Sequence, residues 1–271
     1  HSHELHDDYA WIKQKNWQEV LKDPTKLNLE VANYLREEND FVKQQLKDQK
    51  QLEEEIFQEL KKKIKDKDSS VPLQDGAYSY FVEYGEGAEY PSFKRNGPGN
   101  TTETIFDAQK RSEGKKFFNL SSVSHSHDHR FIAYNVDNNG SENYFLSVEN
   151  LENNKILTKD IPKTTGEIIW DTDNKHIYYI SLDHNHRPNK IYKHLVGQDY
   201  KLDELIFEEK DPAFFCSVSL SQSKEYLFIR TGDHQTTEYY IRNINNQNDK
   251  LKSFFPKITK HEYEIDHGDG Y

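Results

Sequence analysis

Three histidines alternate with other residues at His125, His127 and His129, and Asp128 lies among them. Imidazole nitrogens and carboxylate oxygens are ligands that proteins offer to transition metals. In an extended segment, side chains two residues apart share a face, so the three imidazoles would converge on one metal ion. The segment also falls at a predicted turn, where polar residues are expected in any case. We therefore interpret it as a polar turn, with a metal site as the alternative.

Two further groups carry histidines. His1, His3 and His6 could bind a metal ion adventitiously at the terminus. The segment HNHRP at 184–188 is cationic and could be a ligand site. Pro188 would make the same segment an ordered connection between two strands, and we prefer that interpretation.

Candidate nucleophiles and acid–base residues are few. Cys216 is the one cysteine and lies in the apolar run FFCSVSL, which indicates a small buried hydrophobe rather than a nucleophile. The adjacent acids Glu208 and Glu209 have no recognisable partner acid. The G-x-S-x-G pattern of an α/β-hydrolase is absent, as are the P-loop, G-x-G-x-x-G, HExxH and CxxC motifs. We therefore assign no catalytic, cofactor-binding or metal-binding residue, and no cofactor.

Composition limits the possible partners of the chain. Its 271 residues are 34% apolar and 31% charged, with a net charge of −11. The 17 Tyr and 15 Phe supply apolar area for a core, so the chain is predicted to fold. The negative charge argues against nucleic acid or an anionic membrane as a partner. No apolar run could span a bilayer and no secretory segment follows the polar start, so we expect a cytoplasmic protein.

Residues 1–68 are predicted to be a helical N-terminal segment. The aromatic-rich stretch DDYAWIKQKNWQEVL leads into a short helix that ends before Pro24. A helix over 28–46 begins with Asn28 as its N-cap, and a second helix spans 50–66. The second helix has an apolar residue every four positions, with acids near its start and bases near its end. The polar stretch 66–70 marks the change to a strand pattern, and we place a domain boundary there.

Residues 69–271 consist of short strands rich in Ile, Tyr, Phe and Val, separated by polar turns. The clearest unit has four strands, at 167–170, 176–182, 189–195 and 204–209. The pattern recurs about every 45 to 50 residues, also in 69–108, 118–160 and 214–257. A lone four-stranded meander would leave two faces and two edges exposed, so the copies must pack together. This period is typical of the blades of a β-propeller.

The final residues continue the pattern. Residues 262–265 are predicted to form the first strand of another blade, and Tyr271 would begin its second strand. The fold class is therefore mainly β with an α-helical N-terminal segment, in which 69–271 form an incomplete β-propeller of about four blades. The sequence has no methionine, even at position 1. We expect the chain to be the front part of a longer protein.

Several stretches resemble prolyl-oligopeptidase-type serine peptidases. DDYAWIKQKN, followed by the acidic helix YLREEN, resembles the N-terminal segment of these enzymes. HNHRPNKIYKH at 184–194 and DPAFFCSV at 211–218 resemble the oligopeptidase B branch of the family more specifically. The resemblance covers the chain from about Asp8 to Tyr271.

This resemblance implies an α/β-hydrolase domain capped by a seven-bladed propeller, with the N-terminal helices packed on the hydrolase domain. It implies a serine endopeptidase that cleaves short peptides after Arg or Lys, in which the propeller restricts entry by size. The catalytic Ser, Asp and His mostly lie in the C-terminal half of such enzymes, which this sequence does not contain. No catalytic residue is therefore carried onto a position of this chain, and we expect the chain alone to be inactive.

Three alternatives stay open at this stage. The chain could be one subunit of a split enzyme that docks a separate hydrolase chain through its helices. It could be a stand-alone propeller scaffold that binds peptides or proteins, or an inactive gene fragment. Co-purification with a hydrolase chain would favour the split enzyme. Cooperative unfolding of an isolated monomer, or of a dimer that completes the ring, would favour the scaffold. Low solubility would favour the gene fragment.

Overall fold

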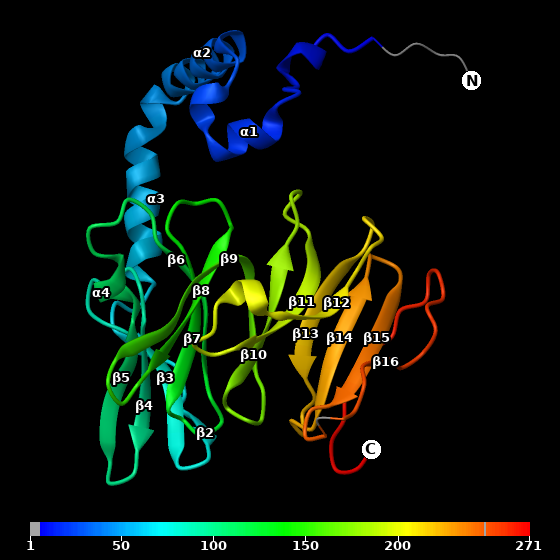
Figure 1. The fold of residues 1–271 in the computed structure, drawn as a ribbon. Helices are drawn as coiled ribbons and strands as arrows, with labels where there is room; N and C mark the ends of the chain where they lie inside the picture. Colours follow the sequence, from blue (N-terminus) through cyan, green and yellow to red (C-terminus); the bar gives the residue numbers. More distant parts are fainter. Residues whose placement is uncertain (1–5, 247) are drawn as a thin grey trace. The chain divides into compact units, whose positions relative to one another are not determined.

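The computed structural model describes residues 6–246 and 248–271. It separates into two compact units, His1–Asp68 and Ser69–Tyr271. In the described residues, the first unit is helical and the second is built mainly of strands (Figure 1). No helix in these residues combines the length and the apolar character needed to cross a membrane.

The first unit alternates short 3-10 helices with α-helices. They are η1 (Ala10–Ile12), α1 (Trp17–Lys22), η2 (Pro24–Lys26), α2 (Leu29–Gln45), η3 (Lys47–Gln49) and α3 (Lys50–Lys62). The predicted cap of α2 is confirmed, because the Asn28 side chain accepts a hydrogen bond from Glu30 N at 2.8 Å. Helix α3 ends at Lys62 rather than at 66. The N–H groups of Lys63 and Ile64 bond to carbonyls three residues back and tighten the end of the helix.

The second unit contains three hydrogen-bonded sheets in the described residues. The first sheet has β1 (Asp68–Ser69), β2 (Leu73–Asp75), β3 (Tyr78–Tyr84), β4 (Ser92–Gly97) and β5 (Thr101–Asp107), followed by α4 (Ala108–Ser112). The second has β6 (Asn119–His125), β7 (Phe131–Asp137), β8 (Tyr144–Asn150), β9 (Lys155–Trp170), β10 (His176–Leu182), β11 (Pro188–Leu195) and β12 (Glu204–Glu208), with η4 (Tyr200–Leu202) before β12. The third has β13 (Phe215–Leu220), β14 (Tyr226–Gly232), β15 (Thr237–Asn243) and β16 (Lys252–Ser253).

These strands make four antiparallel blades. Blade 1 is β2–β5, blade 2 is β6–β9, blade 3 is β9–β12 and blade 4 is β13–β16. Strands predicted at 176–182 and 189–195 are confirmed nearly to the residue as β10 and β11. At the start of the repeat predicted over 69–108, the structure has two short strands, β1 and β2, in place of one. At the end of the repeat predicted over 214–257, only Lys252–Ser253 form a strand.

The end of the repeat predicted over 118–160 and the strand predicted at 167–170 belong to one continuous strand, β9, which corrects the prediction of separate units. Thr164 pairs with Tyr144 in β8 and with Ser181 in β10, so the same residue belongs to two blades. Asp160 and Lys163 have positive φ values of 55° and 58°. These two left-handed residues shift the pairing register without ending the strand, so blades 2 and 3 share one sheet.

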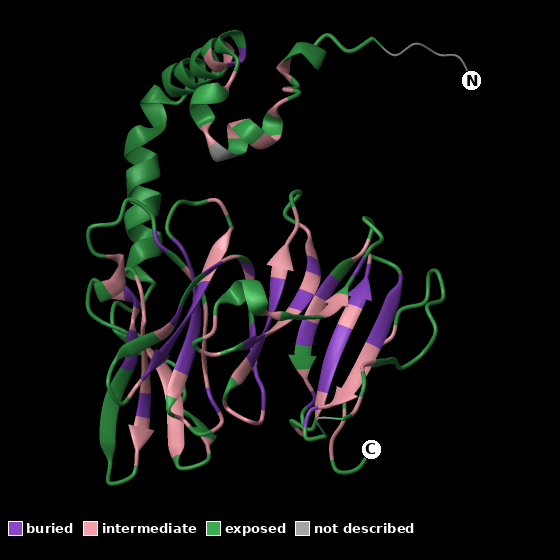
Figure 2. Ribbon diagram, in the orientation of Figure 1, coloured by how far each residue is buried: buried purple, intermediate pink, exposed green. Residues whose placement is uncertain are grey.

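Each hydrophobic core lies between two blades. Along β10, Ile177 and Tyr179 pack with Leu146 of blade 2, whereas Tyr178 and Ile180 belong to a core with residues of blade 4. A third core joins blades 1 and 2. Successive side chains point to opposite faces of a strand, so a strand buried on both faces is apolar at nearly every position. Figure 2 shows this burial concentrated in the strands of the second unit.

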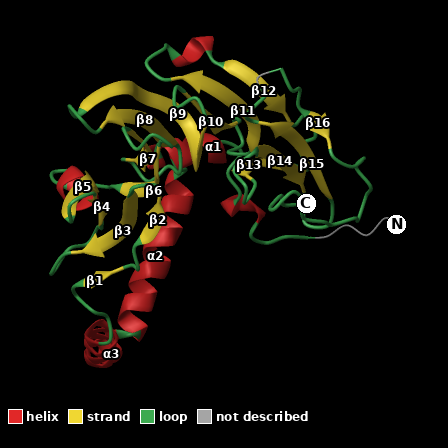
Figure 3. Cartoon of the chain, turned by 90° about the horizontal axis from the view of Figure 1, so that it is seen from below, coloured by secondary structure: helices red, strands yellow, loops and turns green. Residues whose placement is uncertain are grey.

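The four blades follow an arc, and the strands of blades 1 and 4 do not pair with each other (Figure 3). The strand predicted at 262–265 is not formed, which is a second correction. A strand needs a neighbouring strand with which it forms a regular series of backbone hydrogen bonds. Residues near 262–265 make only isolated hydrogen bonds to β15. Thr237 N donates to His261 O at 2.9 Å, and Tyr239 N donates to the hydroxyl oxygen of Tyr263 at 3.0 Å.

Candidate functional site

The turn between the first and second strands has the same geometry in blades 2, 3 and 4. In each, the carbonyl oxygen of the first turn residue accepts a hydrogen bond from the N–H three positions later. The N–H of the first turn residue donates to the carbonyl oxygen of the first residue of the second strand. These turns are Ser126–His129, Asp171–Asn174 and Ser221–Lys224. Their last residues are left-handed, with φ values of 62°, 56° and 59°. Gly76, in the shorter turn between β2 and β3 of blade 1, has a φ of 57°. This repeated turn fixes where the alternating histidines point.

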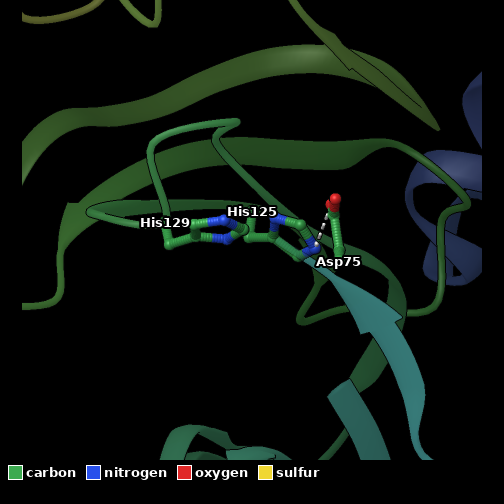
Figure 4. Close-up of side chains that lie close together, drawn as sticks. All are labelled: Asp75, His125 and His129. Carbon is green, nitrogen blue, oxygen red and sulfur yellow. Dashed lines mark ion pairs between the residues drawn. The ribbon is translucent and has the colours of Figure 1, made fainter. Parts of the chain in front are cut away.

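Residues 126–129 form the polar turn that the sequence favours, and the alternative in which three imidazoles share a face is not realised. His125 is the last residue of β6, but the following turn reverses the chain, and left-handed His129 leaves the extended pattern. His127 Nε2 lies 3.3 Å from the carbonyl oxygen of Trp170 in blade 3. His125 and His129 meet instead with Asp75, at the end of β2 in blade 1 (Figure 4). The ligand-type atoms of these three residues lie within 4.8 Å of one another.

Tyr80 of β3 organises both imidazoles. Its ring stacks on the His125 ring with centroids 3.8 Å apart, and its hydroxyl lies 2.8 Å from His129 Nδ1. Burial lowers the pKa of His125 and of His129 below the ordinary value, and the Asp75 carboxylate only partly offsets this effect. Burial thus favours the neutral form of both rings.

The turns of neighbouring blades also contact one another. Asp128 N donates to Asn174 Oδ1 at 3.0 Å, which joins blades 2 and 3. Lys224 Nζ of blade 4 lies 3.4 Å from Asp75 Oδ1 of blade 1. The Asp75–His125–His129 cluster thus lies where turns from three blades meet. Of the terminal histidines, His1 and His3 lie outside the described residues.

The HNHRP segment is an ordered connection, as preferred, but Arg187 rather than Pro188 makes most of its contacts. Its guanidinium pairs with Asp183 at 3.1 Å and donates to the carbonyl oxygens of Asp211 and Phe214. The loop between β10 and β11 is thereby tied to the connection between β12 and β13. His184 and His186 are exposed.

Cys216 lies in the core between blades 3 and 4, with 3% of its surface exposed. Burial, together with the nearby carboxylates of Glu167 and Glu209, raises the pKa of its thiol to about 12. The thiolate needed for nucleophilic attack is therefore scarce at neutral pH. The structure gives Cys216 the packing role expected from its sequence.

Glu208 and Glu209 point to different environments. Glu208 is exposed and forms a cross-strand ion pair with Lys190 at 3.4 Å. Glu209 is buried, accepts hydrogen bonds from the Thr231 hydroxyl and from Asp211 N, and lies 3.7 Å from Lys257 Nζ. The two carboxylates do not face a common cleft, so they are no acid–base pair.

A buried network has the order of a catalytic triad. His194 Nδ1 lies 2.7 Å from Asp203 Oδ1, and His194 Nε2 lies 2.8 Å from the hydroxyl oxygen of Thr158. The His194 side chain is 0% exposed, and the Thr158 hydroxyl oxygen also accepts from Gly197 N at 2.9 Å. No substrate can approach the hydroxyl, so this network is structural.

A second hydroxyl–imidazole contact joins Ser223 Oγ and His267 Nδ1 at 2.8 Å. Ser223 Oγ also lies 2.9 Å from Ser221 Oγ and accepts from Glu225 N at 3.2 Å, so it is part of the turn network. Sequence reasoning missed both hydroxyl–imidazole contacts. Their partners lie 36 and 44 residues apart, and no local pattern marks them.

The family model described as "Prolyl oligopeptidase, N-terminal beta-propeller domain" matches residues 1–271. The chain belongs to the prolyl oligopeptidase family. The open array of four-stranded blades after an N-terminal helical unit is the corresponding part of this peptidase family. The family assignment confirms the resemblance found in the sequence and the propeller fold class.

Relatives in the prolyl oligopeptidase family agree with this assignment. Protease 2 of Moraxella lacunata is 26% identical over 98% of this chain and 39% of its own length. Dipeptidyl aminopeptidase BI of Pseudoxanthomonas mexicana is 25% identical over 84% of this chain and 33% of its own length. The chain therefore spans well under half of each of these relatives.

Solved structures of the family share the fold. Oligopeptidase B from Leishmania major superposes with a TM-score of 0.85 at 24% identity, over 97% of this chain and 37% of that chain. Oligopeptidase B from Trypanosoma brucei, in a closed form with covalently bound antipain, gives a TM-score of 0.83 at 25% identity, over 97% of this chain and 36% of that one. The sequence and structural comparisons thus both match the chain to the front part of longer peptidases.

Proposed function

We propose that this chain is the size-selecting, non-catalytic part of a serine endopeptidase that cleaves short peptides after Arg or Lys. The observation that carries the proposal is the similarity to oligopeptidase B over 97% of the chain, against 37% of the longer protein. In the described residues, each hydroxyl or thiol weighed as a nucleophile is buried or committed to local hydrogen bonds. The bond-cutting residues then belong to a hydrolase domain on further polypeptide.

The N-terminal helices are proposed to dock on that hydrolase domain. Helix α3 exposes an apolar stripe whose members have exposed fractions between 49% and 57%: Leu52, Ile56, Phe57 and Leu60. A stripe of this kind is normally buried against a neighbour. The α/β-hydrolase domain is the neighbour that the family resemblance supplies, whether on the same chain or on a separate one.

Mixing the chain with a separately produced hydrolase domain of a related oligopeptidase B tests this proposal. We expect a complex that hydrolyses short Arg peptides and discriminates against a long or folded substrate more strongly than the hydrolase domain alone. Ile56→Glu with Leu60→Glu should abolish complex formation, whereas Gln58→Glu on the other side of α3 should not. Failure of the unaltered chain to bind or to change size selection would contradict the proposal.

A further inference from the structure

Asp75 lies in blade 1, and His125 and His129 lie at one turn of blade 2. Their possible metal-ligand atoms are nevertheless within 4.8 Å of one another. Figure 4 shows the two imidazoles and the carboxylate close to one another. Two imidazoles and a carboxylate form a donor set that suits zinc and related divalent metals. Donor atoms about 2.0–2.2 Å from a tetrahedral zinc ion lie roughly 3.3–3.6 Å apart, so these atoms would have to approach one another by up to about 1.5 Å.

The hydrogen bonds of His125 fix which nitrogen is available. His125 Nδ1 lies 3.1 Å from the carbonyl oxygen of Ser126, and a carbonyl oxygen only accepts. Nδ1 therefore carries the proton, and the lone pair of Nε2 points toward Asp75 Oδ2 at 3.7 Å. A divalent cation placed between this nitrogen and the carboxylate could bind both of them. A ring N–H bonded to a backbone carbonyl is also the usual support for a metal-binding imidazole.

His129 belongs to the same cluster. The Tyr80 hydroxyl occupies Nδ1, and Nε2 lies beside Gly76, the residue after Asp75. A Cβ at position 76 would be 2.8 Å from His129 Nε2. The absence of a side chain there lets the imidazole approach the backbone next to Asp75. Tyr80 thus positions both rings, by stacking on one and hydrogen bonding to the other.

Lys224 is the competing cation. Its ammonium lies 3.4 and 3.5 Å from the two Asp75 oxygens, but 55% of the side chain is exposed. A solvent-exposed ion pair is weak, and the long side chain can swing away when a divalent ion binds. Removing this charge should therefore strengthen metal binding.

The other group of possible metal ligands in the described residues consists of Asp171, Asp173 and His176. Its donor atoms already take part in ion pairs and hydrogen bonds within the protein. His176 Nδ1 lies 2.6 Å from Asp173 Oδ2. Asp171 Oδ2 pairs with Lys193 at 2.6 Å and accepts from the Tyr178 hydroxyl at 3.0 Å. This group is a completed hydrogen-bond network, so it serves as an internal contrast.

We propose that Asp75, His125 and His129 form a binding site for one divalent transition-metal ion of the zinc class. Solvent water would complete a tetrahedral coordination shell. The ion would join the β2–β3 turn of blade 1 to the β6–β7 turn of blade 2. Because it binds only the folded arrangement, it would raise the free energy of unfolding in proportion to its occupancy.

The test uses the full chain with His1, His3 and His6 replaced by alanine, which removes adventitious binding at the terminus. Co²⁺ is titrated while its visible d–d absorption is followed, and Zn²⁺ binding is measured by calorimetry. We expect one equivalent to bind and the melting temperature to rise. His125→Ala and His129→Ala should each weaken binding more than about 100-fold, and Tyr80→Phe about 10-fold.

Two matched variants sharpen the result. His127→Ala, which removes the neighbouring histidine, should leave affinity unchanged, and Lys224→Gln should strengthen it severalfold. Asp75→Asn, a change of one atom, tests the carboxylate without altering side-chain shape. Circular dichroism of each variant separates lost binding from lost folding. No binding by the background variant, or binding that survives in folded His125→Ala and Asp75→Asn, would overturn the proposal.

Discussion

The guanidinium of Arg187 donates a hydrogen bond to the carbonyl oxygen of Phe214 at 2.9 Å. It thereby joins HNHRP and DPAFFCSV, the two stretches that most resemble oligopeptidase B. The same guanidinium pairs with Asp183, so one side chain holds the β10–β11 loop against the β12–β13 connection. The contact lies between blades 3 and 4, where one side chain of the first stretch is bound to backbone carbonyl oxygens of the second.

Arg187→Ala is predicted to lower the free energy of unfolding by about 3 kcal/mol, because Asp183 would keep a largely buried charge without its partner. The stability of Arg187→Lys should lie between those of the unaltered protein and Arg187→Ala. The lysine ammonium keeps the positive charge but lacks the forked guanidinium that reaches several carbonyl oxygens. Urea denaturation measures both effects. His184→Ala, in the same loop but exposed, should stay within about 0.5 kcal/mol. Equal effects of Arg187→Ala and His184→Ala would contradict this role.

Asp183 should make stability fall in acid. Burial alone would raise the pKa of its carboxyl, but hydrogen bonds from Arg187 N and Asn185 N and the pairing with the Arg187 side chain outweigh burial and lower it. A group with a lowered folded pKa stabilises the protein fully above its unfolded pKa of about 4, and that stabilisation is lost as pH falls toward the folded pKa.

The measurement is the free energy of unfolding between pH 7 and about 3. Asp183→Asn should reduce the slope below pH 5 and lower stability at pH 7. Glu86→Gln removes one negative charge from an exposed loop residue and should change neither. An unchanged slope in Asp183→Asn would exclude Asp183 as a source of acid sensitivity.

Gly232 should not tolerate a side chain. An added Cβ would lie 2.3 Å from the backbone carbonyl oxygen of Thr236, and a backbone atom in a paired hairpin cannot rotate away. Gly232→Ala is therefore predicted to cost about 1–3 kcal/mol by overpacking. Gly85→Ala, where the nearest atom would be 3.8 Å away, should be neutral or slightly stabilising. Thermal unfolding of the two variants compares them, and similar melting temperatures would refute the steric argument.

Cys216 is predicted to resist thiol reagents in the folded protein. Its burial and its raised pKa, about 12, both suppress the thiolate. Reaction with a chromogenic disulfide should follow unfolding and reach one thiol per chain only in denaturant. Fast labelling under native conditions, with Cys216→Ala as the blank, would show that the blade 3–blade 4 core opens readily.

The sequence predicts strands best where both faces are buried. β10 is apolar at almost every position and lies between clear turns, so its ends could be placed. The sequence pattern indicates two strands in place of β9, and Pro162 and Gly166, residue types that usually interrupt strands, lie between them. Two left-handed residues, Asp160 and Lys163, absorb the irregularity instead. Positive φ at a non-glycine residue has little sequence signal, so the continuous strand could not be foreseen.

The histidine cluster was predicted only in part for a similar reason. Local spacing placed His125 and His129 close together, and the structure agrees. The third group is Asp75 rather than His127, because the blade turn redirects the chain and another blade supplies the carboxylate. Residues that meet between neighbouring blades are about 50 residues apart in the sequence, which is close to the length of one repeat. No local sequence motif therefore indicates such contacts.

The central claim is that this chain carries no peptidase centre of its own and that the hydrolase half supplies it. The most direct measurement exposes the purified chain to a serine-directed phosphonate and to a fluorogenic dipeptide substrate with arginine at the cleavage site. The account predicts neither covalent labelling nor turnover by the chain alone, and both when a hydrolase domain completes the enzyme. Labelling of a residue within the isolated chain, at a rate above its denatured control, would contradict it.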